Sequence, residues 1–149
     1  MATEVVEIPI VPAATANLQC EVLDPNGINP VEVIQDGDAF VVRLRLQLQG
    51  VLWDLATVNF EAKVAIESIG AGPEGSQPGA PVVVVHNGTP GNSPYNYTVD
   101  VPVGPLPLAP GESSTAYRLV ATLLGRKNGT PTGIGGFCDV GVVQVIDVP

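Results

Sequence analysis

Residues 40–49 read Phe-Val-Val-Arg-Leu-Arg-Leu-Gln-Leu-Gln, and this stretch decides the fold. Apolar residues occupy every second position in it, and mostly arginine or glutamine stands between them. Because successive side chains of a β-strand point to opposite faces, this alternation gives a single strand one apolar face and one polar face. The stretch therefore predicts a long strand with one buried face.

Six other stretches favour strands in the same way, either by alternation or by a short apolar run. They cover residues 18–23, 58–66, 82–85, 95–103, 117–123 and 137–148. The segments between them are rich in Gly, Pro, Asn and Asp, which are the residues that form turns. Apolar residues at helical spacing do not persist in any longer stretch, so we expect no long helix. The sequence predicts an all-β domain of about seven strands.

The composition is that of one folded domain. The chain has 149 residues, of which 45% are hydrophobic and 14% charged, and it contains 17 glycines and 15 prolines. This balance argues against disorder and suits many short segments joined by turns. We expect an N-terminal arm over residues 1–16 and one β-sandwich domain over residues 17–149.

The charge balance excludes two classes of partner. The chain has 15 acidic and 6 basic residues, a net charge of −9, and its first basic residue is Arg43. Nucleic acids and anionic membranes both require clustered Lys or Arg, so we expect neither as a partner. The N-terminus has no positively charged leader, and no apolar run is long enough to span a membrane. We expect a cytoplasmic protein or part of an assembly exported by a non-classical route.

One short motif points to a known architecture. Residues 114–119 read Ser-Thr-Ala-Tyr-Arg-Leu, with Tyr117 near the start of the sixth expected strand, and a Gly-Asp pair at residues 37–38 precedes the long strand. The chain resembles the immunoglobulin-like or fibronectin-III-like superfamily, and Tyr117 looks like its tyrosine corner. The resemblance implies a two-sheet antiparallel sandwich. Leu119 stands where an antibody-type domain has its second cysteine, so the likeness concerns architecture alone and implies no function.

The chain has two cysteines, Cys20 and Cys138. They are compatible with a single disulfide or with two buried thiols. First and last strands are neighbours in many sandwiches of the resembled superfamily, which implies that the two cysteines lie close together. A bond between them would stabilise the fold by roughly 4 kcal/mol. With His86 as the single histidine, the sequence has too few ligands for a zinc site.

The sequence contains no arrangement typical of an active site. His86 precedes Asn87-Gly88 and is interpreted as a surface turn residue, and no Gly-x-Ser-x-Gly motif is present. Asp36 and Asp38 are interpreted as turn acids, because their spacing matches no calcium-binding loop. We therefore expect a non-enzymatic protein without a cofactor or a bound metal.

An apolar segment precedes the expected strands. Residues 4–11 read Glu-Val-Val-Glu-Ile-Pro-Ile-Val, with Val5, Val6, Ile8 and Ile10 as apolar positions. Such an arm can fold back as an edge strand of its own domain, or it can add to the open sheet edge of a neighbouring subunit. The four apolar residues are the expected assembly contacts in the second case.

Two functions remain after these exclusions. The first is a non-enzymatic structural or interaction protein, a self-assembling subunit of a filament, sheath, shell or appendage whose partner is itself or another protein. It would associate through β-edge contacts and its N-terminal arm. The alternative is a small module that binds carbohydrate or another ligand, with Trp53, Asp36 and Asp38 as candidate contacts. Trp53 is the best candidate for an exposed aromatic, whereas core packing is favoured for Tyr95 and Tyr97.

Overall fold

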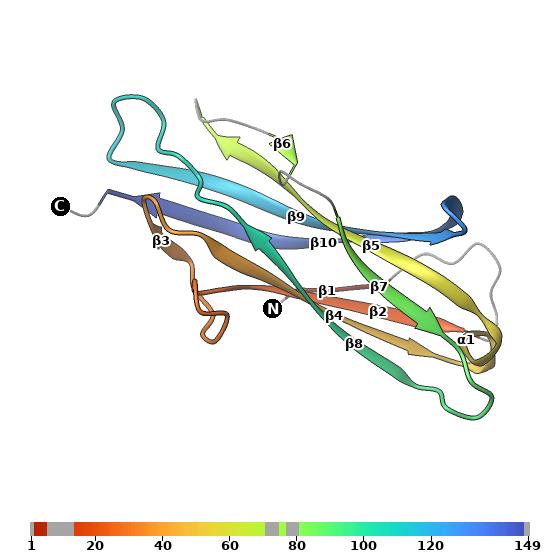
Figure 1. Cartoon of the computed structure of the whole chain (residues 1–149). Coiled ribbons are helices and arrows are strands. Elements are labelled where there is room, and N and C mark those ends of the chain that lie inside the picture. Colours follow the sequence, from red (N-terminus) through yellow and green to blue (C-terminus); the bar gives the residue numbers. More distant parts are fainter. Residues whose placement is uncertain (1, 6–13, 71–74, 77–80, 148–149) are drawn as a thin grey trace.

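The computed structural model describes residues 2–5, 14–70, 75–76 and 81–147, and within them the protein is all-β with two sheets (Figure 1). The elements are β1 (Ala2–Val5), β2 (Thr15–Leu23), β3 (Val33–Gln35), β4 (Phe40–Gln49), α1 (Val51–Leu55), β5 (Thr57–Ile69), β6 (Gly75–Ser76), β7 (Val82–Asn87), β8 (Tyr95–Val103), β9 (Ser114–Lys127) and β10 (Thr130–Ile146). All seven expected strands are present, as β2, β4, β5, β7, β8, β9 and β10. The short strands β1, β3 and β6 are additional.

The two sheets differ in strand direction. The first sheet has the order β1-β2-β4-β8, and all of its pairs are antiparallel. The second has the order β3-β10-β9-β5-β6, and β7 also pairs with β5. Because β3 runs parallel to β10, this sheet is mixed. The expectation that both sheets are antiparallel is therefore wrong at this pair, where a three-residue strand lies beside the end of β10.

The core lies between the two sheets, which face each other as layers in Figure 1. On β4, the apolar positions of the alternating stretch are all at most 2% exposed. They are Phe40, Val42, Leu44, Leu46 and Leu48. Fully burying one such side chain stabilises a fold by about 1.5–3 kcal/mol, so this strand alone contributes a large share of the core. The predicted buried face is confirmed.

A disulfide joins the two layers. Cys20 on β2 is bonded to Cys138 on β10, with a Cα–Cα distance of 6.3 Å. Both residues are buried, so the bond lies inside the sandwich. The close approach of the first and last long strands, which the resemblance implied, is confirmed.

The loop between β8 and β9 is held by two side chains of β9. The Tyr117 hydroxyl donates a hydrogen bond to the carbonyl oxygen of Pro107, and the Thr115 hydroxyl accepts one from the Ala109 N–H. Burial raises the pKa of Tyr117, which keeps its hydroxyl protonated as a donor. Both contacts fasten the backbone of this loop to the start of β9.

The last residues of the expected arm already belong to the first sheet and the core. Ala14 and Ala16 are buried in the core, and β2 begins at Thr15 rather than after residue 16. No helix in the part of the chain that the structure describes has the length and apolarity needed to cross a membrane.

Candidate functional site

The N-terminal arm contributes an edge strand to its own first sheet. Residues 2–5 form β1, which pairs antiparallel with β2 from Ala2 opposite Cys20 to Val5 opposite Asn17. The described part of the arm therefore folds back onto its own domain and does not extend toward a neighbouring subunit. Val6, Ile8 and Ile10 lie outside the described residues. The backbone of Val5 is therefore already engaged by the chain's own β2.

The expected ligand contacts do not come together. Trp53 lies in α1 and is 1% exposed, and its indole Nε1 donates a hydrogen bond to the Thr15 carbonyl oxygen at 3.0 Å. The expectation of an exposed Trp53 is wrong, because the short helix after Gly50 turns the indole into the core, where it packs against Phe60. Asp36 and Asp38 are exposed in the turn after β3, at the opposite end of the sandwich from α1 (Figure 1).

The interpretation of His86 as a surface turn residue is also wrong. Its side chain is fully buried, because it shares the inward face of β7 with Val82 and Val84. Its Nε2 lies 2.8 Å from the Trp53 carbonyl oxygen, which only accepts, so Nε2 carries the proton. Its Nδ1 then accepts from the Tyr97 hydroxyl at 2.7 Å. Neither ring nitrogen is left to act as a base, and the imidazole has a structural role.

A buried carboxylate holds the connection between β7 and β8. Asp54 is 7% exposed and accepts hydrogen bonds from the N–H groups of Gly91 and Ser93 and from the Tyr95 hydroxyl. Burial raises the pKa of Tyr95 and so favours its role as a donor. With the His86 contacts, these bonds form a polar cluster that closes one end of the sandwich. Sequence reasoning missed the cluster, because its members lie far apart in the chain and match no short motif.

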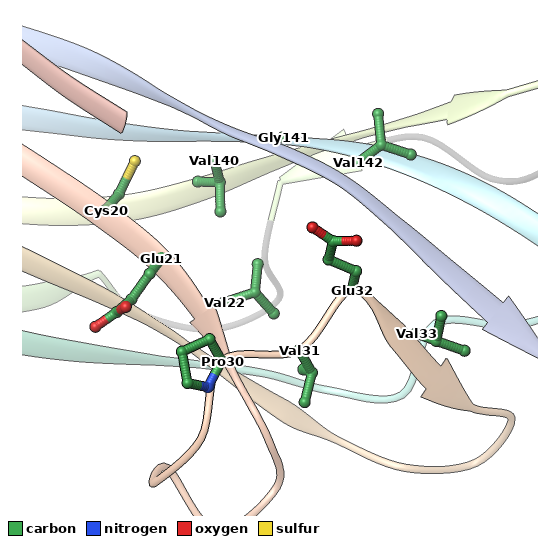
Figure 2. Close-up of a pocket in the computed structure, with 10 residues that line it drawn as sticks. All are labelled: Cys20, Glu21, Val22, Pro30, Val31, Glu32, Val33, Val140, Gly141 and Val142. Atoms are coloured by element: carbon green, nitrogen blue, oxygen red, sulfur yellow. The ribbon is translucent and has the colours of Figure 1, made fainter. Parts of the chain in front are cut away.

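An open groove of about 660 Å³ lies between β2, β10 and the segment that leads into β3. Figure 2 shows that its lining is mostly aliphatic, with valines from all three segments and the carboxylates of Glu21 and Glu32. Glu21 is paired with Arg45 at 2.7 Å. The lining contains no histidine, serine or lysine, so it offers no nucleophile paired with a base. No group of His, Cys, Asp and Glu suited to a metal ion occurs among the described residues.

Strand β7 is an open sheet edge. Within the described residues it pairs only with β5, from Val82 opposite Ala62 to Asn87 opposite Thr57. The Gly88 N–H donates a hydrogen bond to the Ala56 carbonyl oxygen at 2.8 Å. This bond shows which residues of β7 direct their backbone N–H and C=O groups toward β5. Hydrogen-bonded pairs alternate in antiparallel sheets, so the backbone groups of residues 82, 84 and 86 bond to β5. Those of residues 83, 85 and 87 face away from it.

The side chains of this edge are apolar and exposed. Val83 is 50% exposed and Val85 is 55% exposed, and β7 contains no proline, lysine or acidic residue. Natural proteins normally protect sheet edges with charges, prolines or very short strands. The β8 edge has such protection, because it carries Pro102 and an Asp100 that is paired with Arg43 at 2.7 Å. Edge strands β1 and β3 are short.

Comparison with known proteins leaves the family open. No protein-family model and no curated protein matches the chain. The X-ray structure of Northeast Structural Genomics Consortium target SoR45 is 10% identical, with a TM-score of 0.29 over 94% of this chain and 90% of that one. The putative ApaA protein from Bordetella pertussis, target BeR40, is 12% identical, with a TM-score of 0.31 over 95% of this chain and 98% of that one. Likeness at these TM-scores carries no argument about function.

Proposed function

We propose that the protein is a non-enzymatic structural subunit that associates with further copies of itself through the open edge of β7. The observation that carries the proposal is the combination of backbone groups at residues 83, 85 and 87 that have no partner among the described residues with the exposed side chains of Val83 and Val85. An unprotected edge of this kind is a template for pairing with another strand.

A second copy of the chain is the occupant that suits this edge best. Two β7 strands related by a two-fold axis pair antiparallel, so that each copy presents the same residues to the other. With the axis at Val85, this residue lies opposite the Val85 of the second copy, and no charged side chain of β7 enters the contact. Pairing through an uncharged strand lets two copies meet without bringing acidic groups together, although each has a net charge of −9.

The interface is small, and association through it alone is expected to be weak. Two half-exposed valines per copy bury little apolar surface compared with the cost of immobilising a partner. The fraction associated should therefore depend on concentration. A larger structure would require a second contact, for which the arm residues Val6, Ile8 and Ile10 stay candidates.

We also propose an immunoglobulin-like architecture for the domain. The two facing sheets and the hydrogen bond from Tyr117 to the Pro107 carbonyl support it. The mixed second sheet departs from the antiparallel arrangement of that architecture. The binding of a ligand by Trp53 with Asp36 is not proposed, because Trp53 is buried and lies far from Asp36.

The proposal is tested by placing a charge on the edge. The wild type, Val83→Lys, Val85→Lys and a control, Val142→Lys, are compared by light scattering from micromolar to near-millimolar concentration. Val142 is 50% exposed on β10, so the control introduces the same charge at equal exposure away from β7. We expect the wild type and the control to rise above the 15.3 kDa of one chain, and both β7 variants to stay near it.

A chain lacking residues 1–12 separates the edge from the arm. If β7 forms the contact, this deletion leaves the mass above that of one chain. The proposal is wrong if the wild type stays at 15.3 kDa at every concentration, or if only the deletion lowers the mass while the lysine variants associate normally.

A further inference from the structure

The outer face of the first sheet carries an unusual set of side chains. Five outward positions on β2, β4 and β8 carry carboxamides, and we call the surface that they form with two threonines the amide face. Its members are Thr15, Asn17, Gln19, Gln47, Gln49, Asn96 and Thr98. The strand register aligns Asn17, Gln47 and Asn96 in one row across three strands. Directly opposite residues have Cβ atoms about 5 Å apart, so these amides are neighbours.

The amide face is hollowed. A depression of about 410 Å³ lies over the three strands, with Asn17, Gln19, Gln47, Asn96 and Thr98 in its lining together with Arg45. Tyr97 contributes to the floor while its hydroxyl bonds to the buried His86. Most of the residues that line the depression are therefore polar, and they stand on a hydrogen-bonded sheet.

The carboxamides of this hollow are not used by the fold. Within the described residues, the side chains of Asn17, Gln19, Gln47 and Asn96 make no hydrogen bond to other protein groups. Each carboxamide offers two N–H donors and one carbonyl acceptor on a flat group. Several such groups on adjacent strands form a fixed array of donors and acceptors.

Among the described side chains of this face, the charges cancel. Arg43 is paired with Asp100, and Arg45 is paired with Glu21, each at 2.7 Å. The hydrogen bond and the charge of Arg43 lower the pKa of Asp100, so this pair stays ionised near neutral pH. An array of donors and acceptors without net charge favours a neutral ligand. The net charge of −9 on the whole chain further disfavours an anionic one.

We infer that the hollow of the amide face binds a neutral oligosaccharide. Sugar hydroxyls act both as donors and as acceptors, which is the complement of a carboxamide array. A row of three side chains on adjacent strands spans about 10 Å, which is close to the length of a disaccharide. The hollow lacks an exposed aromatic side chain for stacking, so we expect binding by hydrogen bonds and of modest strength. This site lies on the other sheet from β7 and does not rest on the proposed self-association.

The test follows the side-chain amide signals of the folded protein by NMR. The ¹⁵N-labelled chain is titrated with cellotetraose, maltotetraose, xylotetraose and mannotetraose, and separately with tetragalacturonic acid as an anionic probe. We expect saturable shifts of the Asn17, Gln47 and Asn96 side-chain signals with at least one neutral sugar. The anionic probe is expected to leave these signals unchanged.

Two variants and a matched control identify the site. Gln47→Glu keeps the shape of the side chain and removes its N–H donors. Asn96→Ala removes one carboxamide. Each variant is expected to weaken sugar binding by about fivefold to tenfold. Asn59→Ala removes an exposed strand amide from the outer face of the second sheet and should leave the affinity unchanged.

Three results overturn the inference. They are the absence of saturable shifts with every neutral sugar, shifts with the anionic sugar alone, and a loss of affinity in Asn59→Ala equal to that in Asn96→Ala. Shifts of the amide face that follow protein concentration without sugar would instead identify this face as a contact between copies.

Discussion

Loss of the Cys20–Cys138 disulfide is expected to lower the melting temperature by about 15 °C. The bond joins residues separated by 118 positions. In the chain-entropy model, a closed loop of that length removes about 16 cal/mol/K from the unfolded chain, which is about 5 kcal/mol at room temperature. For a chain of about 150 residues, each kcal/mol shifts the melting temperature by about 2–4 °C.

The assay is calorimetry of the chain with Cys20→Ala and Cys138→Ala together, compared with oxidised and with reduced wild type. Both cysteines are at most 1% exposed, so the alanines also remove core contacts. The reduced wild type keeps both sulfur atoms and isolates the effect of the covalent bond. We expect it to melt far below the oxidised form and slightly above the double variant. Melting of the oxidised and reduced forms within about 3 °C of each other would refute this reasoning.

Three further substitutions, with Gly104→Ala as a control, test particular contacts by urea unfolding. Gly88→Ala should lower the free energy of unfolding by about 3 kcal/mol, because the added Cβ would lie 2.1 Å from a backbone carbonyl oxygen of α1. Gly104→Ala should leave it nearly unchanged, because no atom lies within 4 Å of the added Cβ. Tyr97→Phe should cost about 1–3 kcal/mol by leaving a buried imidazole nitrogen without its donor. Asp100 has a pKa below its ordinary value because Arg43 bonds to it. Its stabilising contribution is therefore full above pH about 4 and lost as the pH falls through the folded pKa, and Asp100→Asn should reduce this acid sensitivity.

Strands with one buried face could be predicted from the sequence. Residues 40–49 alternate without interruption, and β4 follows them because the buried face of the sandwich accepts every second side chain. The pairing of Cys20 with Cys138 followed from the resemblance to sandwiches whose first and last strands are neighbours. Strands β3 and β6 have three and two residues, too few for any periodicity, and their pairing depends on distant segments.

The buried polar cluster was harder to predict. His86 precedes Asn87-Gly88, a typical turn pair, and this local signal favoured a surface position. Its alternation with Val82 and Val84, which places all three side chains on one face of the strand, was the available indication that it is buried. Trp53 lies in a helix of five residues, which is too short to show an apolar stripe. Its hydrogen-bond partners, the Thr15 carbonyl and the His86 side chain, are more than thirty residues away, and no local pattern reveals them.

The amide face could be partly predicted. The polar positions of residues 40–49 indicated an exposed strand face, but the rows formed with Asn17 and Asn96 depend on the register of β2 and β8 against β4. That register places two arginines beside Glu21 and Asp100 and so neutralises the face.

Hydrogen exchange of the β7 amides tests the central claim of self-association most directly. The outward-facing N–H groups of Val83, Val85 and Asn87 are measured by NMR at dilute and at near-millimolar concentration, with the inward-facing amide of Val84 as the internal reference. If β7 pairs with β7 of another copy, the outward amides gain protection with concentration while Val84 does not change. Exchange of these three amides that stays fast and independent of concentration would contradict the account.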